Sequence, residues 1–202
     1  MVDWLHLRGA HARAKEAGGG PTAILQRIGA LSLPAPGAKG SNRRQIVAAQ
    51  LPMQTWPEQR LLIVAVNAET GERRAFDRTS GIDLVDAVLA SSAFVGWPPA
   101  LFQGHHYIDG GFNSTDNADL AVGFDRVLIL ALRSAVPPLC VVSLDAAVET
   151  LRGGGARVEV IHPDEDTLAA FASVGMNPAV CGPVARAGRA PHEQYKPAFD
   201  VQ

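Results

Sequence analysis

The sequence predicts an α/β fold, a three-layer α/β/α sandwich with a largely parallel central sheet. Two continuous apolar runs, at residues 60–67 and 126–132, are typical of strands that are buried on both faces. Segments with helical spacing of apolar residues lie before, between and after these runs, separated by glycine- and proline-rich breakers. Strands that alternate with helices in this way favour a parallel sheet with helices on both faces.

The first quarter of the chain predicts only helices. Apolar residues recur at helical spacing over residues 4–7 and again over 24–31, and the breaker GGGP at 18–21 separates the two segments. A second breaker covers residues 34–40. Ser41 then provides a side chain that can cap a helix extending to Pro52.

The middle of the chain predicts a hairpin followed by a helix. The apolar strand at 61–67 leads into ETGE at 69–72, where glycine suits the left-handed position of a tight turn. The alternating segment 73–77 provides the second strand. Asp83 then opens a helix, which ends before the rigid WPP at 97–99.

The second half predicts strands at 105–108, 126–132 and 157–161. Helices are expected over residues 142–151, ended by GGG at 153–155, and over 164–174, which begins at an acidic capping sequence. The glycine- and proline-rich residues beyond Met176 predict an irregular tail. We therefore expect one partial domain over residues 1–177 and a tail over 178–202.

The composition describes a chain that can bury a core. Hydrophobic residues make up 47% of the chain and charged residues 19%, which argues against disorder. A formal net charge of -2 gives no basic field of the kind that attracts nucleic acid. Cys140 and Cys181 lie in apolar surroundings without metal-ligand spacing, so we expect two buried thiols and no metal site.

The run Asp109-Gly110-Gly111 places a carboxylate at the end of a short strand, directly before a tight turn. Asp and Gly also favour plain β-turns for conformational reasons alone, so these three residues by themselves leave both interpretations open. Polar residues follow at Asn113, Ser114 and Asn117. They could orient the carboxylate by hydrogen bonds or form local turns of their own.

The sequence around this turn resembles the patatin-like phospholipases. The run YIDGGFNS at 107–114, followed by NADLA at 117–121, is similar to the aspartate motif of that family. Upstream, AVLASSAFVGWPP at 87–99 looks like the helix and proline-rich turn that precede the motif. The resemblance extends from about residue 24 to about residue 177.

The resemblance implies a lipid acyl hydrolase with a Ser–Asp dyad, without histidine, metal or cofactor. Asp109 matches the aspartate that acts as general base, which the chemistry requires because a serine hydroxyl is a weak nucleophile until a base takes its proton. Partial burial would raise the pKa of such an aspartate. Gly110 and Gly111 would allow close approach of backbone and substrate, and Asn113 and Asn117 would support the site.

The family's nucleophile has no match in this sequence. Its serine lies in a Gly-x-Ser-x-Gly turn between a strand and a helix, and no such pentapeptide occurs here, nor does a glycine-rich oxyanion loop after a first strand. Ser173, in FASVG, follows the aspartate and lacks the first glycine. Ser91 and Ser92 end a helix without a strained elbow, which favours packing roles for both. His105 and His106 are strand neighbours and should face opposite sides.

These observations favour an acyl hydrolase fragment that lacks its serine-bearing N-terminal strands and is inactive as an isolated chain. The alternative is a non-catalytic lipid- or acyl-chain-binding protein of the same fold, with aromatic residues lining its groove instead of its core. We expect a lipid or acyl ester as partner, a missing segment or second copy to cover the open sheet edge, and a cytoplasmic location, free or peripheral to a membrane. The aromatic candidates for the groove are Trp4, Trp56, Trp97 and Phe102.

Overall fold

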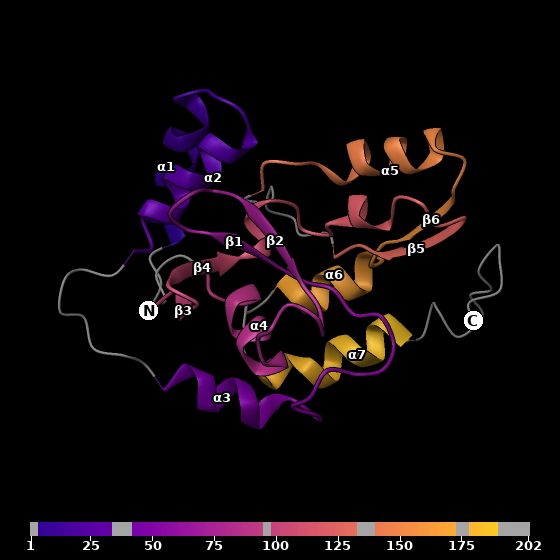
Figure 1. Ribbon diagram of the computed structural model, residues 1–202. Helices are drawn as coiled ribbons and strands as arrows, with labels where there is room; N and C mark the ends of the chain where they lie inside the picture. Colours follow the sequence, from indigo (N-terminus) through magenta and orange to yellow (C-terminus); the bar gives the residue numbers. More distant parts are fainter. Residues whose placement is uncertain (1–3, 34–41, 95–97, 133–139, 173–177, 190–202) are drawn as a thin grey trace. The chain divides into compact units, whose positions relative to one another are not determined.

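The computed structural model describes residues 4–33, 42–94, 98–132, 140–172 and 178–189 (Figure 1). Contacts divide the chain into two compact units. The first unit comprises Met1–Asn117 with Leu139–Val142, and the second comprises Ala118–Pro138 with Ser143–Gln202. Ser41, Trp97 and Ser173 lie outside the described residues. No helix in the described ranges is long and apolar enough to cross a membrane.

The first unit begins with the predicted helices, which are α1 (Trp4–Glu16), α2 (Pro21–Ala30) and α3 (Arg43–Gln50). The break between α1 and α2 falls at the predicted glycines, because Gly18 and Gly19 adopt φ values of 70° and 92° that an L side chain rarely accepts. Proline then occupies the first turn of α2, where its missing N–H leaves no hydrogen bond unmade.

Four strands of the described chain form the sheet of the first unit, in the order β2-β1-β4-β3. They are β1 (Ile63–Asn67), β2 (Arg73–Phe76), β3 (Ala100–Phe102) and β4 (His105–Asp109). Every neighbouring pair is antiparallel, so the prediction of a largely parallel central sheet is wrong for this unit. The physical reason is that short connections join β1 to β2 (residues 68–72) and β3 to β4 (residues 103–104). Connections this short join antiparallel strands, because a parallel pair needs a crossover of about a dozen residues or more.

Strand β3 is an element that sequence reasoning missed. It joins β4 through Gln103 and Gly104, which have φ values of 52° and 78°. Two successive positive φ values are the requirement of a type I′ hairpin turn. The dipeptide Gln-Gly is a weaker signal for this turn than Asn-Gly or Asp-Gly, and the preceding prolines obscured it.

The sheet of the first unit carries helices on both faces. Val66 and Ile108 pack with Leu25 and Ile28 of α2 on one face. Ala65 and Tyr107, the strand neighbours of those two residues, face the helix α4 (Leu84–Ser91) on the other side. Figure 1 shows α2 and α4 on opposite sides of β1 and β4. The predicted layering of helix, sheet and helix is therefore present within this unit, although its sheet is antiparallel.

The second unit contains a parallel strand pair, β5 (Arg126–Leu130) and β6 (Arg157–Ile161). The helix α5 (Leu144–Gly153) connects them, as the sequence predicted. Its first turn is capped by the Ser143 Oγ, which accepts a hydrogen bond from the Ala146 amide at 3.3 Å. Apolar residues of α5 and of the strands share one core cluster, which includes Val127, Ile129, Val148 and Leu151.

The C-terminal residues are more helical than predicted. After α6 (Glu165–Ala172) come a 3-10 turn, η3 (Pro178–Val180), and α7 (Cys181–Arg189), so an irregular tail is wrong for residues 178–189. Proline within the first turn of α7 is compatible with a helix, and Arg186 and Arg189 favour its C-terminal end. Cys140 is buried as expected, but Cys181 at the start of α7 is exposed.

Candidate functional site

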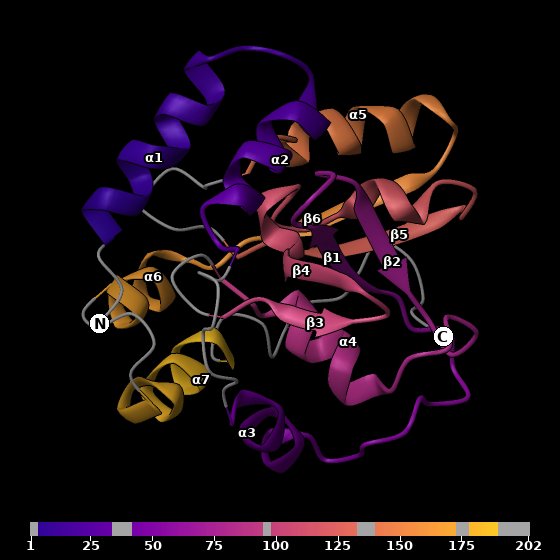
Figure 2. The same ribbon diagram turned by 60° about the vertical axis from the view of Figure 1, so that its left-hand side comes forward.

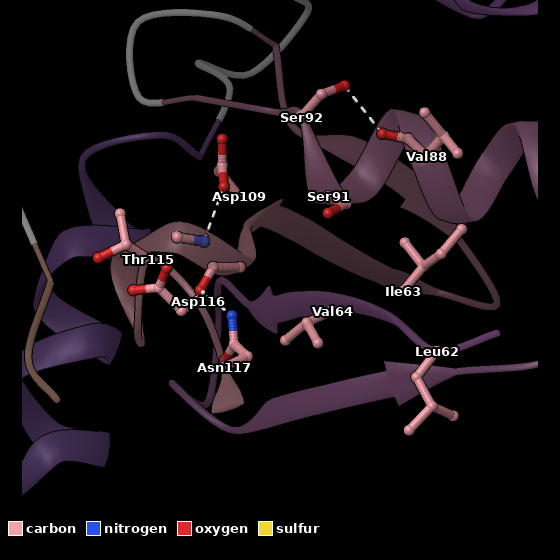
Figure 3. A pocket seen from close by; sticks show the side chains of 12 residues that line it. Leu62, Ile63, Val64, Val88, Ser91, Ser92, Asp109, Thr115, Asp116 and Asn117 are labelled. Atoms are coloured by element: carbon pink, nitrogen blue, oxygen red, sulfur yellow. Dashed lines mark hydrogen bonds between the residues drawn. The ribbon is translucent and has the colours of Figure 1, made fainter. Parts of the chain in front are cut away.

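Asp109 is the last residue of β4, at the strand end where the sequence predicted it. Its amide donates a hydrogen bond to the Ala93 carbonyl at 2.9 Å, which fixes the strand end beside the end of α4. Its carboxylate oxygen Oδ1 accepts a hydrogen bond from the Gly111 amide at 2.7 Å, which starts the 3-10 turn η1 (Gly110–Phe112). Figure 3 shows the other oxygen directed away from that turn. Among the described residues, Oδ2 has no hydrogen-bond partner.

The carboxylate lies at a cavity of about 410 Å³. Ser91 and Ser92 at the end of α4 line this cavity. One wall is apolar and the other is polar (Figure 3). The apolar wall includes Leu62, Val64 and Val88, and the polar wall includes Thr115, Asp116 and Asn117.

Burial raises the pKa of Asp109 above the ordinary value of an aspartate, because a low-dielectric environment disfavours the charged form. The hydrogen bond from Gly111 and the positive charge of Arg43 act in the opposite direction without cancelling the rise. A raised pKa is the direction expected for a carboxylate with a general-base role.

The two glycines after Asp109 are needed for reasons within the protein. A Cβ atom on Gly110 would lie 2.4 Å from the carbonyl oxygen of Val64, so the turn can pass β1 only without a side chain. A Cβ atom on Gly111 would lie 3.0 Å from Asp109 Oδ1. The expected close approach of backbone is present at Gly110, where strand β1 passes, and the Asp109 carboxylate lies against Gly111, while the approach of a substrate stays a prediction.

Asn113 and Asn117 support the turn and do not bind the carboxylate of Asp109. The Asn113 Nδ2 donates to the Asn117 Oδ1 at 3.0 Å. The Asn117 Nδ2 donates to the carbonyls of Ser114 at 2.7 Å and Gly110 at 3.4 Å. Of the two roles left open for these residues, the structure shows the local one, and through Gly110 it stabilises the backbone that follows Asp109.

Neither serine near Asp109 is arranged as a substitute nucleophile. The Ser92 Oγ donates to the Val88 carbonyl at 2.8 Å, within its own helix. Ser91 lines the cavity, but neither hydroxyl is hydrogen-bonded to Asp109 in the described structure. A nucleophilic serine needs its base within hydrogen-bonding reach, so the packing interpretation of both residues is favoured.

The two histidines of β4 diverge as predicted. His105 is exposed, whereas the His106 Nδ1 lies 2.6 Å from the Glu69 Oε1. The Glu69 carboxylate also accepts hydrogen bonds from the His106 amide. Within the described ranges, no group of three or more His, Cys, Asp or Glu residues could hold a metal ion.

The aromatic candidates for a lipid groove belong to the core where their side chains are described. Trp56 and Phe102 pack against the cluster on the α4 face of the sheet. The indole Nε1 of Trp56 donates to the Ile82 carbonyl at 2.9 Å, which fixes the ring in that position. The side chains of Trp4 and Trp97 lie outside the described residues.

Sequence reasoning missed Arg43 as a neighbour of the site. Its Nη2 donates to the Ser92 carbonyl at 3.1 Å, and its charge attracts that of Asp109. Arg43 and Ser92 are 49 positions apart and belong to different helices. No local pattern could have linked them, because the contact depends on how α3 packs against α4.

Comparison with known families agrees with this geometry. Residues 24–122, about half of the chain, match the family model described as Patatin-like phospholipase. The match confirms the resemblance over these residues, and this part of the chain belongs to the patatin-like phospholipases, whereas the resemblance beyond residue 122 stays a prediction. Asp109 and the strands β1 to β4 lie within the matched residues. No curated protein and no solved structure shows a significant match to the chain.

Proposed function

We propose that this chain supplies the base of a lipid acyl hydrolase site, with Asp109 as general base of a Ser–Asp dyad whose serine lies on another segment. The observation that carries the proposal is the half-buried carboxylate of Asp109 at a cavity: one oxygen accepts a hydrogen bond from Gly111, and the other has no hydrogen-bond partner among the described residues. A base needs this combination, since one oxygen must be oriented while the other receives the proton.

In the proposed reaction, Asp109 takes the proton of the serine hydroxyl as that oxygen attacks the acyl carbonyl carbon. The tetrahedral intermediate collapses, the bond to the leaving alcohol breaks, and Asp109 returns the proton to the alcohol oxygen. Water then attacks the acyl-serine with Asp109 again as base, the bond between the acyl carbon and the serine oxygen breaks, and Asp109 returns the proton to that oxygen, which releases the fatty acid and restores the serine. The apolar wall at Leu62, Val64 and Val88 suits an acyl chain.

The same proposal implies that the isolated chain is inactive. A base without a nucleophile and without oxyanion donors retains little catalysis, because these groups act as a unit. We further propose that a complementary segment adds the strands of a fuller three-layer sandwich, and that the assembled enzyme works in the cytoplasm on lipid esters at a membrane surface.

The first experiment uses a fluorophosphonate, which labels only an activated serine. The chain and its Asp109→Asn variant should both remain unlabelled, and both should hydrolyse p-nitrophenyl esters equally slowly. Co-expression with a segment that carries a Gly-x-Ser-x-Gly elbow should then produce hydrolysis. Asp109→Asn should lower the rate of that hydrolysis by ~10³-fold or more. Stoichiometric labelling of Ser91 or Ser92 that depends on Asp109 would instead make this chain a complete enzyme.

The alternative, a non-catalytic acyl-chain-binding protein, is favoured by the apolar wall alone. It predicts saturable binding of a fluorescent fatty acid that Val88→Asp abolishes, together with no hydrolysis after co-expression. Asp109→Asn separates the two functions, since removing the carboxylate's charge should leave acyl-chain binding intact and should remove hydrolysis.

A further inference from the structure

Two adjacent arginines at the start of α3 reach opposite ends of α4. The guanidinium of Arg44 binds the first turn, with its Nε 2.7 Å from the Asp86 Oδ1 and its Nη2 3.0 Å from the Asp83 Oδ2. Arg43 binds the last turn, where its Nη2 donates to the Ser92 carbonyl at 3.1 Å and to the Ser92 Oγ at 3.4 Å. Figure 2 shows α3 beside α4. The N-terminus of α3 is therefore bound to both ends of α4, the helix whose last residues line the Asp109 cavity.

Arg43 occupies the position where α4 needs a cation and a donor. The last carbonyls of a helix have no partner within the helix, and the helix dipole places partial negative charge there. Arg43 meets both needs at Ser92, while the Ser92 Oγ donates back to the Val88 carbonyl at 2.8 Å. The end of α4 is thereby held from two sides.

This helix end leads directly to Asp109. The residue after Ser92 is Ala93, which is fully buried, and its carbonyl accepts the hydrogen bond from the Asp109 amide at 2.9 Å. A displacement of Ser92 would therefore move the acceptor that holds the end of β4. Arg43 is therefore linked to Asp109 by its hydrogen bond to the Ser92 carbonyl, by the backbone from Ser92 to Ala93, and by the hydrogen bond between the Ala93 carbonyl and the Asp109 amide.

Arg43 also acts on Asp109 electrostatically, since its positive charge lowers the pKa of the carboxylate against the effect of burial. Burial disfavours the ionised carboxylate, and only the ionised form can accept a proton. Asp116 is the other carboxylate that lines the cavity, and it cannot supply the positive charge that favours ionised Asp109. An arginine stays protonated at neutral pH even where burial lowers its pKa, as it does for Arg43.

We propose that Arg43 is the positioning residue of the Asp109 site: it fixes the end of α4 that holds the Asp109 backbone, and it supplies the positive charge that favours the ionised base. The catalytic meaning of this assignment rests on the proposed function. The positioning itself does not, because it can be measured on the chain alone, without a serine or a substrate.

The test is an NMR titration of the full chain labelled with ¹³C at the aspartate carboxyl carbons, with the Asp109 signal assigned from Asp109→Asn. Arg43→Gln keeps hydrogen-bonding capacity but removes the charge, so the Asp109 titration should move to higher pH. Arg43→Lys keeps the charge, so the titration should stay nearer that of the wild type. Arg44→Gln is the matched control, since it is a neighbouring arginine whose partners lie at the other end of α4, and it should leave the titration in place.

Hydrogen exchange measures the second half of the proposal. Exchange of the Asp109 amide should accelerate in Arg43→Gln and Arg43→Lys relative to Arg44→Gln, because Lys cannot reproduce the two-acceptor contact with Ser92. An unchanged Asp109 titration in Arg43→Gln, or an equal shift in Arg44→Gln, would overturn the proposal. If Arg43→Gln does not fold, Arg43→Lys with an Asp109 amide as protected as in the wild type would overturn it too. None of these readouts depends on ester hydrolysis, so a failure here is distinct from a failure of the proposed function.

Discussion

Gly110 lies directly against the backbone of Val64, and a Cβ atom on Gly110 would also lie 2.7 Å from the Val64 carbonyl carbon. Backbone of a central strand cannot move aside as the end of a flexible side chain can. Gly110→Ala should therefore reduce the free energy of unfolding by about 1–3 kcal/mol, as overpacking of a core does. Urea unfolding followed by tryptophan fluorescence measures this change, since all three tryptophans lie in the first unit.

The control for this prediction is Gly9→Ala in α1. The nearest atom to a Cβ at Gly9 is the Nη1 of Arg13 at 3.4 Å, which belongs to a flexible side chain. Alanine is a better helix former than glycine by about 1 kcal/mol, so this variant should be neutral or more stable. Equal losses in the two variants would show that the contact with Val64 is not what requires glycine at position 110.

Asp109→Asn should stabilise the protein, and the gain should depend on pH. The pKa of Asp109 is raised in the folded state, mainly by burial, so the folded chain holds this proton to higher pH than the unfolded chain does. Stability linked to this group is fully present below the ordinary aspartate pKa and is lost as pH rises through the raised pKa. Unfolding of both proteins across this window should give curves that meet at low pH and diverge above it, with the asparagine variant more stable. A variant less stable than the wild type at neutral pH would contradict this prediction.

Glu69→Gln should show the opposite sign. Burial acts to raise the pKa of Glu69, but hydrogen bonds from the ring and amide of His106 outweigh it, and the pKa is lowered. The stability linked to this group is therefore present above the ordinary glutamate pKa and is lost as pH falls through the lowered value. At neutral pH the variant should be less stable than the wild type by under ~1 kcal/mol, since the pair is partly exposed. The difference should shrink in acid, and a difference that grows there would refute the assignment.

The comparison of sequence and structure shows which information is local. The apolar run at 61–67, the turn with glycine and the alternating segment 73–77 predict a hairpin, and the structure forms β1 and β2 there in antiparallel register. The parallel pair β5–β6 and its connecting helix were also predictable, because apolar strands separated by an amphipathic helix fix that connection. The direction of β4 relative to β1 was not predictable, since it depends on the missed hairpin with β3.

The candidate site divides in the same way. Asp109 at a strand end was predictable from its motif, and burial raised its pKa as expected. The role of Gly110 was not, because the contact with Val64 arises from the pairing of β1 with β4. The place of Arg43 beside the site was not predictable for a similar reason, since its partner Ser92 lies at the end of another helix.

Asn117 combines a left-handed backbone with three side-chain hydrogen bonds, and the two contributions can be separated. Its φ of 46° is tolerated by asparagine and glycine but is strained for alanine by roughly 1 kcal/mol. Its side chain donates to the carbonyls of Ser114 and Gly110 and accepts from Asn113. Asn117→Gly keeps the backbone conformation and removes the hydrogen bonds, so it should lower the free energy of unfolding by about 1–2 kcal/mol. Asn117→Ala removes both contributions and should lower it by about 1 kcal/mol more.

Urea unfolding of the two variants and the wild type under the same conditions separates the contribution of the hydrogen bonds from that of the left-handed backbone. Equal stability of the glycine variant and the wild type would show that position 117 requires only the left-handed backbone, and an alanine variant more stable than the glycine variant would show that it requires neither.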